Sequence, residues 1–217
     1  MTHIGFIGSG LIGSQLARRA LANGHSVTMS NSRGPETLAE LITELGDNAT
    51  AGTVRDAATN GDIVVVTVPM AGIASVPADL LAGKIVIDTN NYYFERDGHI
   101  AALDAAETTV SQLLQDHLPE SYVVKAFNNI KFSDITDDAT PAGTPNRRAI
   151  PIAGNFAEAN ATVADLIDGF GFDVLLSGSL ADSWRFERDQ PAYGVVATHD
   201  ELSDKLAAAE RIITPAA

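Results

Sequence analysis

The chain has 217 residues, which suits one α/β domain or a nucleotide-binding domain with a small appendage. Its formal net charge of -14 argues against nucleic acid and against anionic membrane surfaces as partners. Cysteine is absent and no apolar run is long enough to span a bilayer, so neither thiolate chemistry nor a membrane helix is expected. The N-terminus lacks the features of a signal peptide, and the sequence as a whole predicts a cytoplasmic protein.

The first elements along the chain are predicted to be a strand, a glycine-rich turn, a helix and a second strand. Residues 3–7 form a short, mostly apolar run that is typical of a buried parallel strand. Residues 11–23 favour a helix that ends at Gly24, and residues 26–29 form the second strand. Residues 8–13, between the first strand and the helix, fit the motif G-x-G-x-x-G. In this context the motif predicts a dinucleotide-binding site.

Each glycine of the motif has a physical role in this prediction. Gly8 permits the tight turn, Gly10 lets a pyrophosphate approach the backbone, and Gly13 lets the helix pack closely on the strand. The start of the helix offers free N–H groups and the positive end of the helix dipole to the anion. The alternative is a glycine-rich turn in an ordinary βαβ unit. The predicted cofactor-binding loop consists of Gly8, Ser9, Gly10, Leu11, Ile12 and Gly13.

The segment after the second strand favours NADP over NAD. An NAD site usually has an acidic residue there, which holds the ribose 2′-hydroxyl. Residues 30–34 contain none, and the first carboxylate is that of Glu36. Arg33 is therefore predicted to bind the 2′-phosphate, with Ser32 and Asn31 as hydrogen-bond donors. The alternative is that Arg33 lies in solvent near the start of the next helix.

The rest of the chain alternates between helices and strands. Helices are predicted over residues 36–45, 54–59, 111–116, 156–168 and 201–212. Strands are predicted over residues 49–52, 62–69, 84–88, 121–127, 149–153 and 173–176. The proline in the segment 149–153 places that strand near a sheet edge, and the polar segment 132–148 is predicted to be a mobile loop or a lid.

This alternation predicts a Rossmann-type, doubly wound α/β fold with a mainly parallel sheet. Residues 1–217 are interpreted as a single NADP-binding domain with a short C-terminal extension, residues 181–217. The extension holds Trp184, Arg185 and Tyr193, which either line an acceptor pocket or only pack the end of the chain. In this fold, ligands bind at the carboxyl ends of the strands.

Polar residues follow the fifth and sixth predicted strands, where an acceptor would lie. Asn90, Lys125 and Asn128 are the candidate catalytic residues, and Lys125 and Tyr92 are the candidate proton donors. The alternatives are that Lys125 extends from the sheet toward water and that Asn90 only builds the turn. The five histidines are scattered, so no metal site is predicted. Hydride transfer needs alignment rather than a nucleophile, which suits this set of residues.

Five segments of the chain together resemble the NADP oxidoreductases that use coenzyme F-420, a deazaflavin. They are residues 8–13, 30–33, 68–69, 88–91 and 123–128. The reductase domain of membrane ferric reductases has a Lys-Ala-Phe-Asn segment similar to residues 125–128. Residues 128–131 read Asn-Asn-Ile-Lys, whereas many members of the family have a His-Thr-Ile-Pro-like segment there.

The resemblance implies a reductase that lays NADPH across the strand ends and passes hydride to coenzyme F-420 or FMN. Ser9, Ser32 and Arg33 would hold the adenosine phosphate. The cofactor path and the reacting rings would be lined by Val68, Pro69, Asn90, Asn91, Ala126, Phe127, Asn128 and Asn129. Two other functions stay open: an NADPH-dependent reductase of a small carbonyl or imine compound, and a non-catalytic NADP-binding redox sensor. Family members are often dimers, and a homodimer is left open.

Overall fold

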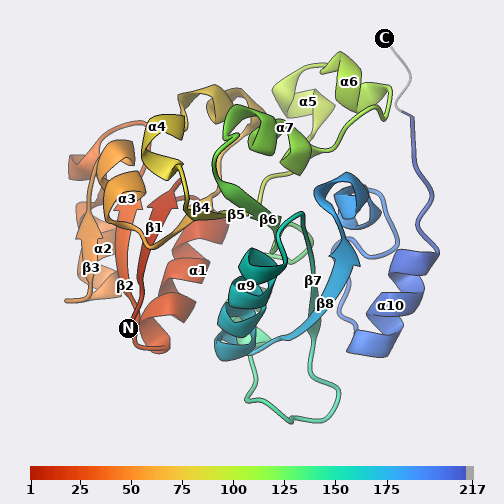
Figure 1. Cartoon of the computed structure of the whole chain (residues 1–217). Helices are drawn as coiled ribbons and strands as arrows, with labels where there is room; N and C mark the ends of the chain where they lie inside the picture. Colours follow the sequence, from red (N-terminus) through yellow and green to blue (C-terminus); the bar gives the residue numbers. More distant parts are fainter. Residues whose placement is uncertain (214–217) are drawn as a thin grey trace.

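Eight strands form one sheet in the computed structural model, which describes residues 1–213 (Figure 1). Their order is β3-β2-β1-β4-β5-β6-β7-β8. All neighbouring strands are parallel except β6 and β7. This confirms the predicted Rossmann-type α/β fold. The strands are β1 (His3–Ile7), β2 (Ser26–Ser30), β3 (Ala49–Ala51), β4 (Ile63–Val66), β5 (Ile85–Asp88), β6 (Tyr122–Lys125), β7 (Ala149–Gly154) and β8 (Asp173–Gly178).

The central strands are apolar because both faces of the sheet are covered. All four residues of β4 are buried, and β4 pairs in register with β1 and β5 through Ile63, which lies opposite Ile4 and Ile85. Figure 1 shows β1 running upward from the N-terminus, so the carboxyl ends of the strands parallel to it lie at the upper edge of the sheet. The segments that follow β1, β4, β5 and β6 therefore meet at one edge.

Helices pack on both faces of the sheet and bury two separate apolar clusters. One face carries α1 (Leu11–Ala22), α8 (Asp134–Asp137) and α9 (Ala157–Phe170). The other carries α3 (Val54–Asn60), α4 (Ala78–Leu81) and α7 (Val110–His117). A third cluster holds α10 (His199–Ala207) and the 3-10 helix η3 (Leu180–Phe186) near β7 and β8. The remaining helices are α2 (Ala39–Leu45), α5 (Phe94–Asp97), α6 (Ala101–Asp104) and the 3-10 helices η1 (Pro35–Leu38) and η2 (Met70–Ser75).

Several element boundaries differ from the prediction. The helix predicted over residues 36–45 is divided into η1 and α2, and the short helices α5 and α6 were not predicted. The last helix begins at a capping box formed by Thr198 and Glu201, but it ends at Ala207 rather than at residue 212. Beyond it the chain turns back over the molecule, because Arg211 donates to Thr108 O at 2.7 Å. Residues 214–217, the end of the predicted extension, lie outside the described residues.

The strand with the proline lies near a sheet edge, as predicted, although it is not the edge strand itself. β8 forms the edge, and β7 lies between β6 and β8. The ladder with β6 covers only Ala153 and Gly154 of β7, which leaves Pro151 outside that ladder. The proline is tolerated inside the sheet because the pairing on that side is so short.

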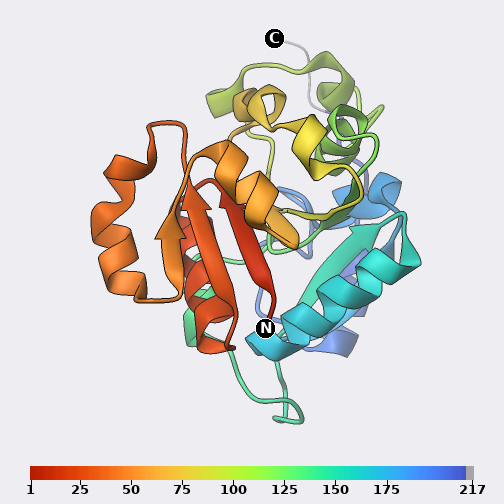
Figure 2. The same cartoon turned by 60° about the vertical axis from the view of Figure 1, so that its left-hand side comes forward.

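The predicted lid, residues 132–148, is fastened to the body of the protein. Arg147 and Arg148 are buried, and their guanidinium groups form ion pairs with two carboxylates each. The partners of Arg147 are Asp168 and Asp173. Figures 1 and 2 show the tip of this loop at the lower edge of the molecule. It therefore projects away from the carboxyl ends of the parallel strands and is not placed to cover them.

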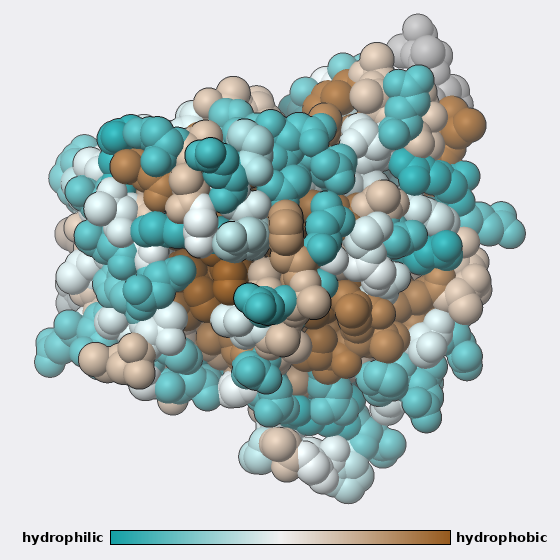
Figure 3. All heavy atoms as spheres, in the orientation of Figure 1, coloured by the Kyte–Doolittle hydropathy of each residue, from teal (hydrophilic) through white to brown (hydrophobic). Residues whose placement is uncertain are grey.

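The surface is mostly hydrophilic, as the net charge of -14 leads us to expect. Figure 3 shows teal residues over most of one face, with brown patches near its centre, where β7 and β8 lie in the same view. Leu176 of the edge strand β8 is 55% exposed and contributes an apolar side chain to the surface. Among residues 1–213, no helix is both long and apolar enough to cross a membrane.

Candidate functional site

The glycine loop leaves an open space at the start of α1. Gly8 adopts a positive φ of 114° and donates to Ser30 O at 3.1 Å, which forms the tight turn after β1. A Cβ on Gly13 would lie 2.8 Å from Thr67 Cγ2, so this glycine permits close packing, as predicted from the motif. A Cβ on Gly10 would have no atom within 4 Å. Space therefore exists where the prediction places the pyrophosphate.

No side chain caps the backbone N–H groups at the N-terminus of α1, so an anion that binds there has no cap to displace. Gly10 is the N-cap and offers no side chain, and the first turn holds no acidic residue. Leu11 at the first helical position is 63% exposed. Unpaired N–H groups at a helix start bind anions well because the dipole adds to their hydrogen bonds.

The turn after β2 presents Arg33 beside this loop. Asn31 Oδ1 accepts from the backbone N–H groups of Arg33 at 2.8 Å and Gly34 at 3.0 Å, and Asn31 Nδ2 lies 3.4 Å from Ser9 Oγ. Asn31 thus builds the turn and joins it to the glycine loop. Ser32 and Arg33 are exposed, and the Arg33 side chain forms no hydrogen bond or ion pair within residues 1–213. Both side chains are free to meet a phosphate.

Asn90 lies after β5 and is held from three sides. Its N–H donates to Asp88 Oδ1 at 2.9 Å, and its carbonyl oxygen accepts from Lys125 Nζ at 3.0 Å. Its side-chain Oδ1 accepts from Val68 N at 2.8 Å. The loop after β4, which contains Val68 and Pro69, is therefore joined to the loop after β5. Asn90 Nδ2 is buried and has no partner within residues 1–213.

Asn91 and Asn128 join the loops after β5 and β6. Asn91 Nδ2 donates to Asn128 O at 2.7 Å, and Asn128 Nδ2 donates to Asn91 Oδ1 at 3.1 Å and to Phe186 O at 2.9 Å. Asn128 Oδ1 is buried without a partner in the described chain. Ala126 N donates to Asp88 O at 3.0 Å, and Phe127 has a positive φ of 58°. The segment after β6 is thus sharply turned and firmly held.

Lys125 is fully buried beneath these loops. Its Nζ lies 3.7 Å from Asp88 Oδ2 and 3.7 Å from Glu187 Oε1, and Ser111 Oγ donates to Asp88 Oδ2 at 2.5 Å. The ammonium group therefore faces two carboxylates and the carbonyl oxygen of Asn90, not solvent. This arrangement suits an electrostatic anchor better than a proton donor, and the catalytic role of Lys125 stays a prediction.

The second candidate donor, Tyr92, is also occupied. Its hydroxyl donates to Asp104 Oδ1 at 2.7 Å and accepts from Ile100 N at 3.0 Å. Burial and the Asp104 carboxylate raise the pKa of Tyr92 above its ordinary value, so this phenol stays protonated at neutral pH. Tyr92 fixes the turn between α5 and α6.

The tail residues occupy different places. Trp184 lines a cavity of about 110 Å³, and two guanidinium groups lie near the centre of its ring, that of Arg185 at 4.6 Å and that of Arg211 at 5.5 Å. Arg185 lies outside this cavity. The hydroxyl of Tyr193 meets that of Tyr93 in a short hydrogen bond, and burial followed by this bond raises the pKa of Tyr193.

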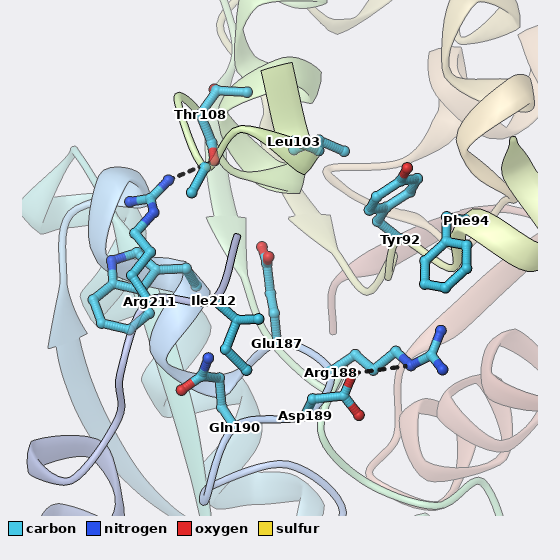
Figure 4. Close-up of a pocket in the computed structure, with 12 residues that line it drawn as sticks. Tyr92, Phe94, Leu103, Thr108, Glu187, Arg188, Asp189, Gln190, Arg211 and Ile212 are labelled. Atoms are coloured by element: carbon cyan, nitrogen blue, oxygen red, sulfur yellow. Dashed lines mark hydrogen bonds and ion pairs between the residues drawn. The ribbon is translucent and has the colours of Figure 1, made fainter. Parts of the chain in front are cut away.

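Glu187 lines this cavity and lies beside the buried Lys125. Figure 4 shows Glu187 between one wall with Tyr92 and Leu103 and another with Arg211 and Ile212. The carboxylate of Glu187 lies 3.7 Å from Lys125 Nζ. Sequence reasoning missed Glu187, because a lone glutamate in a polar segment belongs to no motif. Within residues 1–213, no group of three His, Asp or Glu side chains could hold a metal ion.

Part of the chain matches a known protein family. Residues 3–92 match the family model described as "NADP oxidoreductase coenzyme F420-dependent". This segment of the chain belongs to that family. This confirms the resemblance drawn from the glycine loop and the loops that follow.

Relatives of this NADP oxidoreductase family extend the match beyond the glycine loop. Metalloreductase STEAP3 of Rattus norvegicus is 32% identical over 188 residues, which are 85% of this chain and 35% of STEAP3. The solved structure of a hypothetical protein from Sinorhizobium meliloti has a TM-score of 0.79 at 29% identity and covers 92% of this chain and 97% of its own. A proposed F420-dependent NADP reductase from Arthrobacter sp. has a TM-score of 0.72 at 26% identity, over 84% of this chain and 87% of its own. The chain spans little more than a third of the curated relatives it matches, 35% of one and 39% of another.

Proposed function

We propose that this protein is an NADP(H)-dependent oxidoreductase that transfers hydride between NADPH and coenzyme F-420 or another flavin-like acceptor. The observation that carries the proposal is the exposed Arg33, unpaired within the described chain and joined through the Asn31 turn to the open, uncapped start of α1. NADPH has two anionic groups, a 2′-phosphate and a pyrophosphate. The guanidinium group of Arg33 suits the 2′-phosphate, and the uncapped start of α1 suits the pyrophosphate. No carboxylate precedes Glu36 in this turn.

The far end of the site also fits the cofactor. Two buried amide atoms, Asn90 Nδ2 and Asn128 Oδ1, have no partner in residues 1–213, and buried polar groups normally have one. They lie in the loops after β5 and β6, at the carboxyl edge of the sheet where dinucleotides bind in this fold. The residues present therefore suit a nicotinamide as well as a pyrophosphate.

The chain's own residues bind and orient rather than react covalently. Bound NADPH would supply the hydride, and the reaction then depends on how well the donor and acceptor rings are aligned. The loops after β4, β5 and β6 are fastened to one another through Asn90, Asn91 and Asn128, which gives that edge a fixed shape. Buried apolar side chains behind them, such as Phe127, keep water from the base of the site.

The choice of acceptor draws on the relatives. The Arthrobacter protein carries coenzyme F420 in its name, and STEAP3 is named a metalloreductase. A flavin-like acceptor suits the site because both side chains predicted to donate a proton to a carbonyl or imine, Lys125 and Tyr92, already have partners. We therefore rank the small carbonyl or imine substrate below coenzyme F-420 and FMN.

Stopped-flow absorbance of the purified protein with NADPH tests the proposal, with coenzyme F-420 in one run and FMN in another. We expect loss of NADPH absorbance together with loss of the oxidised acceptor. Tight NADPH binding without turnover of either acceptor would contradict this hydride-transfer function. Turnover that appears only with carbonyl or imine compounds would favour the substrate class ranked below.

A further inference from the structure

We propose that Asn90 and Asn128 form a donor–acceptor pair that recognises the carboxamide of the nicotinamide through both of its polar groups. The inference rests on the proposed function and deepens it. It assigns a direction to each hydrogen bond: Asn90 Nδ2 donates to the carboxamide oxygen, and Asn128 Oδ1 accepts from the carboxamide NH₂ group.

The orientation of the Asn90 amide is fixed by a backbone group. Val68 N–H can only donate, so the atom 2.8 Å away must be the amide oxygen of Asn90. The other side-chain atom is then Nδ2, a donor. Asn90 is 3% exposed, and its Nδ2 has no partner in the described part of the chain. One buried donor therefore stays free.

The Asn128 amide is fixed in the opposite sense. Phe186 O can only accept, so the atom 2.9 Å away must be the amide nitrogen of Asn128. The same nitrogen also donates to Asn91 Oδ1 at 3.1 Å. Asn128 is 4% exposed and its Oδ1 is unpartnered within residues 1–213. One buried acceptor therefore stays free.

The two amides belong to one local assembly. β5 and β6 are paired with Asp88 opposite Lys125, so the loops that carry Asn90 and Asn128 begin side by side. Asn91, the neighbour of Asn90, forms two hydrogen bonds with Asn128. Asn129 Oδ1 is also unpartnered within residues 1–213, but no hydrogen bond joins the Asn129 side chain to the loop after β5, whereas Asn128 is bonded to Asn91.

A carboxamide is the ligand group whose polarity matches this pair. It offers one carbonyl acceptor and one NH₂ donor on the same planar group, and the pair offers one donor and one acceptor. An unsatisfied buried polar group is unfavourable, so a ligand that satisfies both gains on each. Lys125 acts as a positioning residue here, because its ammonium holds the carbonyl oxygen of Asn90 at 3.0 Å and is itself out of reach of solvent.

Isothermal titration calorimetry with three ligands tests the pair. The ligands are NADP, its 3-acetylpyridine analogue, which keeps the carbonyl but has CH₃ in place of NH₂, and 2′-phospho-ADP-ribose, which lacks the ring. Asn90→Asp keeps the acceptor for Val68 N but removes the donor. We expect it to weaken NADP and the analogue about tenfold to a hundredfold, with 2′-phospho-ADP-ribose unchanged.

The acceptor is tested with the unaltered protein. Loss of the NH₂ group should weaken the analogue relative to NADP about tenfold, and Asn128→Ala should abolish that difference. Asn155→Asp is the control: Asn155 Oδ1 also accepts from a backbone N–H, that of Leu180 at 3.0 Å, but Asn155 lies between β7 and α9, and all three affinities should be unchanged. Thermal melting of each variant checks that it is folded.

Each of the contrary results has its own meaning. Equal weakening of all three ligands by Asn90→Asp would overturn the pair, because Asn90 would then only support the loop. Equal affinity of the unaltered protein for NADP and the analogue would overturn the role of Asn128. If neither NADP nor 2′-phospho-ADP-ribose binds the unaltered protein, the proposed function falls and the pair falls with it.

Discussion

Arg33 carries the discrimination between the two nicotinamide cofactors in our proposal. Its side chain is exposed and has no partner within residues 1–213, so its removal should leave the fold intact. We expect Arg33→Ala to weaken NADPH about tenfold to a hundredfold and NADH little, because only NADPH has the 2′-phosphate. Fluorescence titration with both nucleotides measures this. Arg55→Ala, which removes a surface pair with Asp79, is the control, and equal weakening of both nucleotides would contradict the role.

Gly10 and Gly13 should respond differently to the same added methyl group. Gly10→Ala places a Cβ where no atom lies within 4 Å, and its φ of -74° suits any residue, so stability should not change. The methyl would occupy the pyrophosphate space and weaken NADPH and NADH alike. Gly13→Ala places a Cβ 2.8 Å from Thr67 Cγ2 and should destabilise the fold by about 1–3 kcal/mol. Thermal melting measures the stability of each variant, and nucleotide titration measures its affinity. Unchanged affinity of Gly10→Ala for both nucleotides would contradict the placement of the pyrophosphate at this loop.

Strands β5 and β6 depend on the charge of Lys125. Lys125→Met keeps most of the volume but leaves Asp88, which is fully buried, and Glu187 without their cation. Breaking a buried ion pair from one side destabilises proteins by about 3–5 kcal/mol, and we expect a loss of that order in urea unfolding. Lys84→Met, which removes a partly exposed lysine of the same sheet, should cost less. A loss for Lys125→Met no larger than that for Lys84→Met would mean that the cluster is not electrostatically coupled.

Helix α5 is joined to the C-terminal extension by the ion pair of Glu95 and Arg188. Hydrogen bonds from the Arg188 guanidinium lower the pKa of Glu95 to about 2. The folded pKa lies below the unfolded value of 4.5, so this pair stabilises the fold above about pH 4.5 and its contribution is lost as the pH falls toward 2. We expect NMR titration to show that Arg188→Met raises the pKa of Glu95. Titration of Glu95 near 4.5 in the unaltered protein would contradict the pair.

For helices, strands and loops, the sequence predicted those features that depend on a local pattern of residues. The β1–turn–α1 unit was found because Gly8, Gly10 and Gly13 must stand where they do for steric reasons. The length of the final helix was predicted wrongly because Arg211 is drawn to Thr108, about a hundred residues away in sequence, and local pattern carries no trace of that contact. The polar segment 132–148 looked mobile for a similar reason: the acidic partners of Arg147 lie on α9 and at the start of β8.

The sequence predicted where the candidate site lies, but it did not predict the hydrogen bonds among the residues of that site. Strand order alone places Asn90, Lys125 and Asn128 at one edge. Which atoms are satisfied and which are left free is decided by Val68 and Phe186, whose backbone groups come from elsewhere in the chain. Short contacts between distant segments set the chemistry of the site, and spacing in one sequence does not encode them.

For the molecule as a whole, the C-terminal extension belongs to the site. Phe186 and Glu187 hold Asn128 and lie against Lys125, and Gly194 N donates to Asn129 O at 2.8 Å. The glycine loop, by contrast, needs only the first strands and α1. The proposed pyrophosphate half of the site is thus built from the start of the chain, and the proposed nicotinamide half from its middle together with the C-terminal extension.

This division has a consequence for synthesis on the ribosome. A nascent chain that has released β1 to β4 already contains every residue of the glycine loop and Arg33. It cannot fix Asn128 until Phe186 has followed. The adenosine phosphate end of the proposed cofactor site therefore needs only residues that are made early, whereas the end that would hold the reacting ring also needs Phe186.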